Sequence, residues 1–112
     1  MKTRIDGQLM AHAETRRFTN GMTVVVVLVA PDQAGALPVL AEWAFGSTAA
    51  ASYACGNAAR AMRKGTRVVV HGEGLAFGKH SGQPVVRLTL VSHIEHQAAQ
   101  AFHEPQPAAI AA

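Results

Sequence analysis

The sequence predicts an all-β domain with a single helix between its third and fourth strands. Three observations favour this class. Consecutive valines at residues 24–27 favour a strand, because β-branched side chains suit a pleated, half-buried surface. The Asn20-Gly21 pair before them is typical of a hairpin turn, since both residues tolerate positive φ. An alanine-rich stretch between Ser47 and Gly65 supplies the helix, and β-favouring segments follow it.

The first half of the chain contains three expected strands. Residues 4–11 form the first, and residues 22–30 form the second, after the turn at residues 19–21. The apolar run at residues 24–30 predicts that both faces of the second strand are covered, or that one face meets a partner subunit. After a loop at residues 31–36, the third strand spans residues 38–45. Its period of two gives it two faces, Val39, Ala41, Trp43 and Phe45 on one and Leu40, Glu42 and Ala44 on the other.

The helix is expected to begin after Ser47 as the N-cap and to stop at Gly65. Gly56-Asn57 interrupts this stretch, so we expect a kink, or a shorter helix preceded by irregular chain. Arg63 and Lys64 stand near the C-terminal end, where the helix dipole favours cations.

Two further strands are expected at residues 66–77 and 85–94, joined by a loop at residues 78–84. In the last strand, we expect Val86, Leu88 and Leu90 to face the core while Arg87 and Thr89 face solvent. Five strands with one helix between the third and fourth follow the order of an OB-fold, a five-stranded Greek-key barrel. We therefore assign residues 1–96 to one OB-fold domain and residues 97–112, which lack any periodic pattern, to a flexible tail.

Length and composition restrict the number of domains, the kind of partner and the cellular location. A chain of 112 residues suffices for one domain with a modest core. Lys and Arg outnumber Asp and Glu by 10 to 7, a balance that suits an anionic partner without requiring one. The single cysteine, Cys55, allows no internal disulfide, which fits a reducing compartment. The N-terminus lacks an apolar signal region, and the apolar run at residues 24–30 is too short to span a bilayer as a helix, so we expect a cytoplasmic location.

Several motifs occur in a suggestive order: Ile5-Asp6-Gly7-Gln8-Leu9, the segment at residues 14–21, Glu42-Trp43-Ala44-Phe45-Gly46, and Arg63-Lys64-Gly65 before the fourth strand. In order and spacing they resemble the single-stranded DNA-binding protein family of bacteria and their phages and plasmids, across residues 4–96. The stretch between Phe45 and Arg63 is a few residues longer than in that family.

The resemblance implies an OB-fold protein that binds single-stranded DNA without sequence preference and without catalysis, as a dimer or tetramer. The second aromatic position of the family's third strand holds Val39 here, and the hairpin-tip aromatic is replaced by Lys79. Trp43 and Phe77 are the candidate substitutes. The sequence ends without the acidic, Phe-ended tip of the housekeeping type, so we expect no recruitment of replication proteins through the C-terminus. It suggests a phage, plasmid or specialised paralogue, or a primosomal replication protein.

A single strand requires cations for its phosphates and flat side chains for its bases. Trp43 and Phe45 share a strand face and are either stacking residues or core; Phe77 and Lys79 share a face at the start of the hairpin tip. The full set of candidate nucleic-acid-binding residues is Arg16, Arg17, Phe18, Trp43, Phe45, Arg67, Phe77, Lys79 and Arg87.

Other chemistry has little support. His93 and His96 would lie on opposite faces of a strand, so shared metal coordination is not expected. Cys55 has no CxxC partner and is expected to be a small buried residue. We expect no catalytic residue, cofactor or metal. Two alternatives stay open: an OB-fold protein-interaction or assembly module, which the aromatic content of 5% favours, and a small RNA-binding OB domain.

Overall fold

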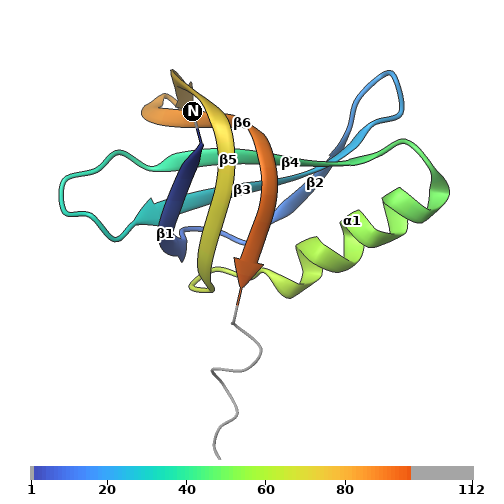
Figure 1. The fold of residues 1–112 in the computed structure, drawn as a ribbon, viewed down its shortest axis with the longest axis horizontal. Coiled ribbons are helices and arrows are strands. Elements are labelled where there is room, and N and C mark those ends of the chain that lie inside the picture. The colour runs from blue at the N-terminus through green and yellow to red at the C-terminus, as the bar shows by residue number, and fades with distance from the viewer. Residues whose placement is uncertain (1, 97–112) are drawn as a thin grey trace, which may run out of the picture.

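The computed structural model describes residues 2–96, which form strands and one helix (Figure 1). The strands of this described part are β1 (Thr3–Leu9), β2 (Glu14–Arg17), β3 (Thr23–Pro31), β4 (Val39–Gly46), β5 (Arg67–His80) and β6 (Gln83–His96). Helix α1 (Ala49–Ala61) lies between β4 and β5. The predicted β-rich class, with its helix between the third and fourth long strands, is confirmed.

The sheet closes into a ring. Its strand order is β1-β5-β6-β4-β3-β2, and an additional β1–β3 pairing joins the two sides. All pairings are antiparallel except that of β4 with β6, which is parallel. In Figure 1, β1, β5 and β6 cross in front of β3 and β4, while α1 lies to one side. The result is a barrel-like sheet with β2 paired to β3 outside the ring.

Gly7 makes the closure possible. It pairs with Val68 of β5 and with Pro31 of β3, so two strands approach it from both sides. A Cβ atom at Gly7 would lie 2.2 Å from the Ala30 carbonyl oxygen, so only glycine fits there.

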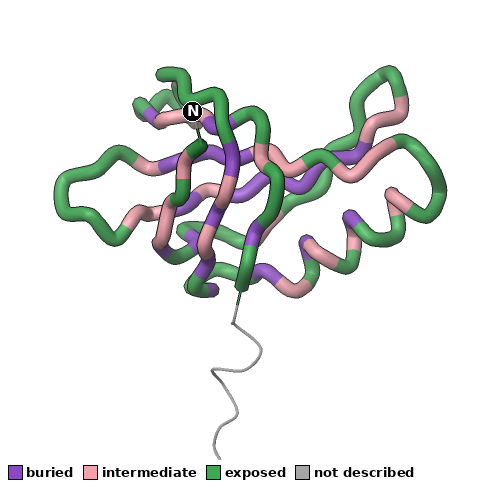
Figure 2. Tube along the Cα trace, in the orientation of Figure 1, coloured by how far each residue is buried: buried purple, intermediate pink, exposed green. Residues whose placement is uncertain are grey.

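Both faces of β3 are buried within one chain. Val25, Val27 and Val29 point inward and join the main core with Leu88 and Ile94. On the opposite face, a smaller cluster contains Val24, Val26, Leu40 and Val85. Figure 2 shows the buried residues concentrated along this strand. The valine run therefore needs no partner subunit to cover it.

The two hairpin turns follow from local chemistry. At the first, Gly21 has φ of 89°, and the Asn20 Oδ1 atom accepts a hydrogen bond from the Met22 amide at 2.9 Å, as expected for an Asn-Gly turn. At the second, Ser81 and Gly82 both have positive φ, 52° and 81°. This tight turn lets β5 and β6 pair through most of residues 78–84, where the sequence predicted a loop.

The helix corrects three predictions. Its N-cap is Thr48, whose hydroxyl accepts a hydrogen bond from the Ala51 amide, and not Ser47. It runs unbroken through Gly56-Asn57, because the buried side chains of Cys55 and Ala59 hold it against the core. It ends at Ala61, so Arg63, Lys64 and Gly65 belong to the following turn.

Leu90 was predicted to face the core, yet it is 66% exposed. The pairing of β5 with β6 shifts register between the His71–His93 pair and the Gly72–Val91 pair, beyond Leu90, so the shift does not account for the exposure of Leu90. Leu88 remains fully buried, as predicted, whereas Val86 and Arg87 are both half-buried.

Candidate nucleic-acid interface

The aromatic pair of β4 is the centre of the candidate site. Trp43 and Phe45 share a strand face, and their ring centroids lie 4.6 Å apart with planes tilted by 51°. Both rings are half-buried and pack against the main core. The two sequence-based interpretations, core and stacking surface, therefore apply to the same side chains: one part of each ring packs inward and another part is accessible.

Strand pairing explains why these rings stay accessible. The ladder between β4 and β6 covers Val39 to Ala41 and then ends. Trp43 lies beyond that point, where β4 has left β6. Its ring there meets the imidazole of His93, with centroids 5.8 Å apart and planes at 88°.

The ring contacts continue onto β5. His93 lies beside His71, with ring centroids 6.3 Å apart and planes within 15°. We call Phe45, Trp43, His93 and His71 the ring strip; it crosses from β4 over β6 to β5. The sequence gave no signal for this arrangement, because the His93–Trp43 contact depends on where two distant strands separate.

Arg16 and Arg17 lie on β2, on the other side of β3 from the end of the ring strip. Arg17 is aligned with Thr23, which is aligned with Gly46, so two strand spacings, roughly 10 Å, separate Arg17 from the β4 backbone beside Phe45. The Arg17 guanidinium donates to Ser52 Oγ of α1 at 3.1 Å. Both arginines line a hollow of about 440 Å³ between β2 and α1.

Phe18 follows directly and is 46% exposed. Its backbone amide donates to the Met22 carbonyl at 2.9 Å, so the hairpin turn fixes its position beside the two arginines. The basic-aromatic group predicted from sequence is thus an exposed unit at one end of the molecule.

Two predicted phosphate contacts are occupied by carboxylates. Arg67 forms two hydrogen bonds to Asp32, at 2.8 and 2.5 Å, and this guanidinium holds the pKa of the Asp32 carboxyl below its usual range. Arg87 donates to Glu42 at 3.0 Å. A phosphate would have to displace a carboxylate at either position, although Arg67 lies on the same face of β5 as His71, four residues before it.

Phe77 and Lys79 lie apart from the ring strip, on the hairpin of β5 and β6. Phe77 is 86% exposed and is aligned with Val86, itself aligned with Val39, four residues before Trp43 on β4. Lys79 is exposed and aligned with Pro84 beside the turn. The two form a second exposed patch.

Two further predictions concern reactive side chains. Cys55 is 1% exposed, as expected of a small buried residue, and burial raises the pKa of its thiol. Within residues 2–96, no group of three His, Cys, Asp or Glu side chains could hold a metal ion. His71 and Val68 are the respective partners of His93 and His96, which therefore face opposite sides of the sheet. The predicted tail at residues 97–112, which contains His103, lies outside the described residues.

Over the described part of the chain, α1 is the only helix, and it is neither long nor apolar enough to cross a membrane.

No protein-family model matches this sequence, and a search of curated proteins returned no match. The candidate interface is therefore defined by the geometry of this chain.

Proposed function

We propose that the protein binds single-stranded DNA largely without sequence preference, and protects or organises it during replication, recombination or repair. The observation that carries this proposal is the ring strip with Arg17 of β2 near its end. Arg16 is aligned with Val24, and Val24 with Ala44, so its side chain leaves the opposite face of the sheet. Flat rings suit bases of any sequence, and guanidinium groups suit the phosphates that connect them. Catalysis has no part in this function.

The charge distribution supports the proposal. Among residues 2–96, the arginines that form ion pairs are Arg4, Arg67 and Arg87. The cations of Arg16, Arg17 and Lys79 form none there and belong to exposed residues. These groups can therefore meet phosphates without first losing a carboxylate partner, and their binding would release counterions from the DNA.

The proposal includes a specific fold assignment, the OB-fold with Greek-key connections. It is supported by a closed ring of β1, β3, β4, β6 and β5, by the parallel β4–β6 pair, and by the helix that connects β4 to β5. On this assignment, β1 and β2 together are the bent first strand of the barrel, and the resemblance over residues 4–96 points the same way.

Binding as a function of salt tests the proposal. A fluorescently labelled oligo-dT should bind with an affinity that falls steeply as salt rises, because several phosphates are neutralised. Arg17→Ala should weaken binding and reduce the logarithmic salt slope by roughly one phosphate equivalent, whereas Arg17→Lys keeps the charge and should keep the slope. Oligo-U in parallel separates DNA from RNA preference. Absence of binding to oligo-dT at low salt would refute the proposal.

A protein-interaction or assembly module, resembling a primosomal protein, is the second candidate. The exposed apolar side chains on the β5–β6 hairpin favour it: Phe77 is 86% exposed, Leu90 66% and Leu75 54%. Apolar groups this exposed are typical of docking surfaces. This function would be preferred if the folded protein failed to bind either nucleic acid.

A homo-oligomer and a cytoplasmic location complete the proposal. The dimer or tetramer now rests on the family resemblance alone, because the chain covers its own valine run. The cytoplasmic location rests on the single, buried cysteine, which suits a reducing compartment.

A further inference from the structure

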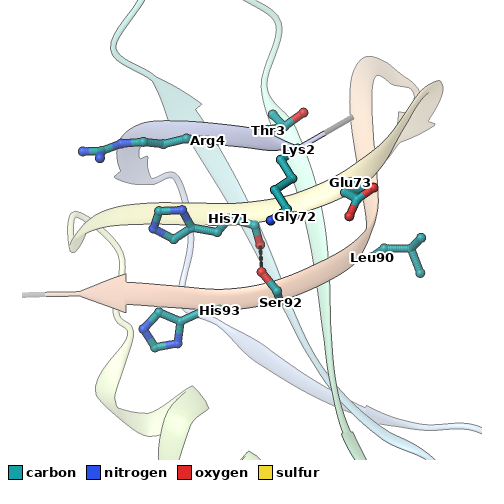
Figure 3. Close-up of a pocket in the computed structure, with 9 residues that line it drawn as sticks. All are labelled: Lys2, Thr3, Arg4, His71, Gly72, Glu73, Leu90, Ser92 and His93. Atoms are coloured by element: carbon teal, nitrogen blue, oxygen red, sulfur yellow. Dashed lines mark hydrogen bonds between the residues drawn. The ribbon is translucent and has the colours of Figure 1, made fainter.

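A cross-strand row of side chains begins where the aromatic pair ends. Arg4 of β1 is aligned with His71 of β5, and His71 is aligned with His93 of β6. Residues aligned on neighbouring strands project side by side from the same face of the sheet. In Figure 3, the imidazole rings of His71 and His93 lie next to each other and are both seen face-on.

The two imidazoles are placed to accept stacked bases. His71 keeps 33% of its side-chain surface exposed, and His93 is an exposed residue. The Glu95 carboxylate lies 2.8 Å from His71 Nε2 and fixes the orientation of that ring. Because Trp43 touches His93 directly, no gap separates this pair from the aromatic pair of β4.

An open hollow borders the row. It measures about 500 Å³ and is lined by both histidines, by Lys2 and Arg4 at its β1 side, and by Leu90 (Figure 3). The hollow therefore connects the histidines of the ring strip on β6 and β5 with the residues at the start of β1. A nucleic-acid strand bound at Trp43 could therefore continue over a flat, partly apolar surface that ends at the cations of Lys2 and Arg4.

Near this row, two cations, Lys2 and Arg4, stand against three carboxylates, Asp6, Glu73 and Glu95, so the local formal charge is slightly negative. Arg4 is ion-paired with Asp6 at 2.8 Å, and Glu73 and Glu95 lie beside His71. Attraction of phosphates is consequently weak here, in contrast to the β2 end. Stacking of bases on the rings is the interaction that this surface favours.

We infer that His93 and His71 are base-stacking residues, and that they extend the nucleic-acid path from β4 across β6 and β5 toward Arg4. This inference rests on the proposed single-strand binding. It gives the bound nucleic acid a path over the barrel. Arg17 of β2 lies at one end of this path, the aromatic pair in the middle and the histidine pair at the other end. The hairpin patch of Phe77 and Lys79 lies off this path.

The test compares a short and a long oligo-dT, of about 6 and about 14 nucleotides, within the span that single OB-folds cover. His93→Ala and His71→Ala should each weaken binding of the long oligonucleotide about fivefold, the effect of losing one weak stacking contact, and leave the short one unchanged. The loss should be the same at low and high salt. His93→Phe, which keeps a flat ring, should restore the affinity. His96→Ala is the matched control, because His96 lies on the same strand but faces the other side.

A second measurement does not depend on any substitution. In the wild-type protein, the imidazole NMR signals of His71 and His93 should shift on addition of the long oligonucleotide, while those of His96 stay in place. Unchanged imidazole signals, or unchanged affinity of the folded alanine variants in a protein that binds the long oligonucleotide, would overturn the inference. If the wild-type protein binds neither oligonucleotide, the proposed function itself fails, and the inference with it.

Discussion

Within residues 2–96, the arginine side chains of this protein fall into two groups, those that pair with a carboxylate and those that do not. Arg4, Arg67 and Arg87 are held by carboxylates, whereas Arg16 and Arg17 form no ion pair within the described part of the chain. Sequence alone cannot make this distinction. Asp32 and Arg67 are 35 positions apart, and Glu42 and Arg87 are 45 apart, so only the closed sheet brings them together.

The exposed ion pairs predict how stability responds to acid. Arg67 and Arg4 hold the pKa of Asp32 and Asp6 below the usual value of 3.8. A depressed pKa in the folded state contributes stability above about pH 4, and this contribution is lost as the pH falls through the folded pKa. The melting temperature should therefore drop below pH 4.

Asp32→Asn provides the comparison for this prediction. It should lower the melting temperature at pH 7 slightly and make the acid drop shallower, and salt should reduce the difference because the pair is exposed. Thermal melts from pH 7 to pH 3 measure both curves. Parallel curves for the variant and the wild type would mean that the ion pair contributes nothing.

At the scale of elements, local patterns were sufficient for most strands. Alternation placed Val39, Ala41, Trp43 and Phe45 on one face, and all four join or pack against the core. The Asn20-Gly21 turn was found because its signal is short-range. Prediction failed for the helix where tertiary contacts override propensity: it continues through Gly56 because its neighbours Cys55 and Ala59 are buried. It failed for Leu90 as well, which is 66% exposed although alternation places it on the face of the buried Leu88.

The residues of the candidate site could likewise be predicted only where a local pattern marks them. Trp43, Phe45 and the arginines of β2 were identified from residue type and strand face. The histidine pair was not, because β4 and β6 are far apart in sequence and their separation beyond Ala41 leaves no local mark. The separation of Phe77 from Trp43 is likewise a property of strand register.

Replacement by alanine should have opposite effects on the free energy of unfolding at Gly7 and at Gly56. Gly7→Ala would press a Cβ against the Ala30 backbone and should destabilise the protein by roughly 1–3 kcal/mol. Gly56→Ala lies inside α1, where the nearest atom to a new Cβ is the flexible Arg60 side chain at 3.4 Å. It should stabilise the protein by about 0.5–1 kcal/mol, because alanine is the better helix former.

Urea unfolding of the two variants measures both effects. A destabilised Gly56→Ala protein would indicate that the helix is distorted at that position after all. An unchanged Gly7→Ala protein would indicate that β1 does not pair with β3 as described.

At the scale of the whole molecule, assembly and binding are linked. The resemblance predicts a dimer or tetramer, in which several ring strips would be available to one strand. Light scattering on the purified protein at micromolar concentration should give a multiple of the chain mass of 11.8 kDa. A mass of 11.8 kDa would contradict the oligomer and leave each chain to bind alone.

Trp43, the only tryptophan of the chain, reports directly on the stacking of bases on the ring strip. Its fluorescence should be quenched when oligo-dT is added at low salt, and high salt should reverse the quenching as the phosphates are released. If oligo-dT binds by an independent assay while the Trp43 spectrum stays unchanged at saturation, Trp43 is a core residue only and the stacking account is wrong.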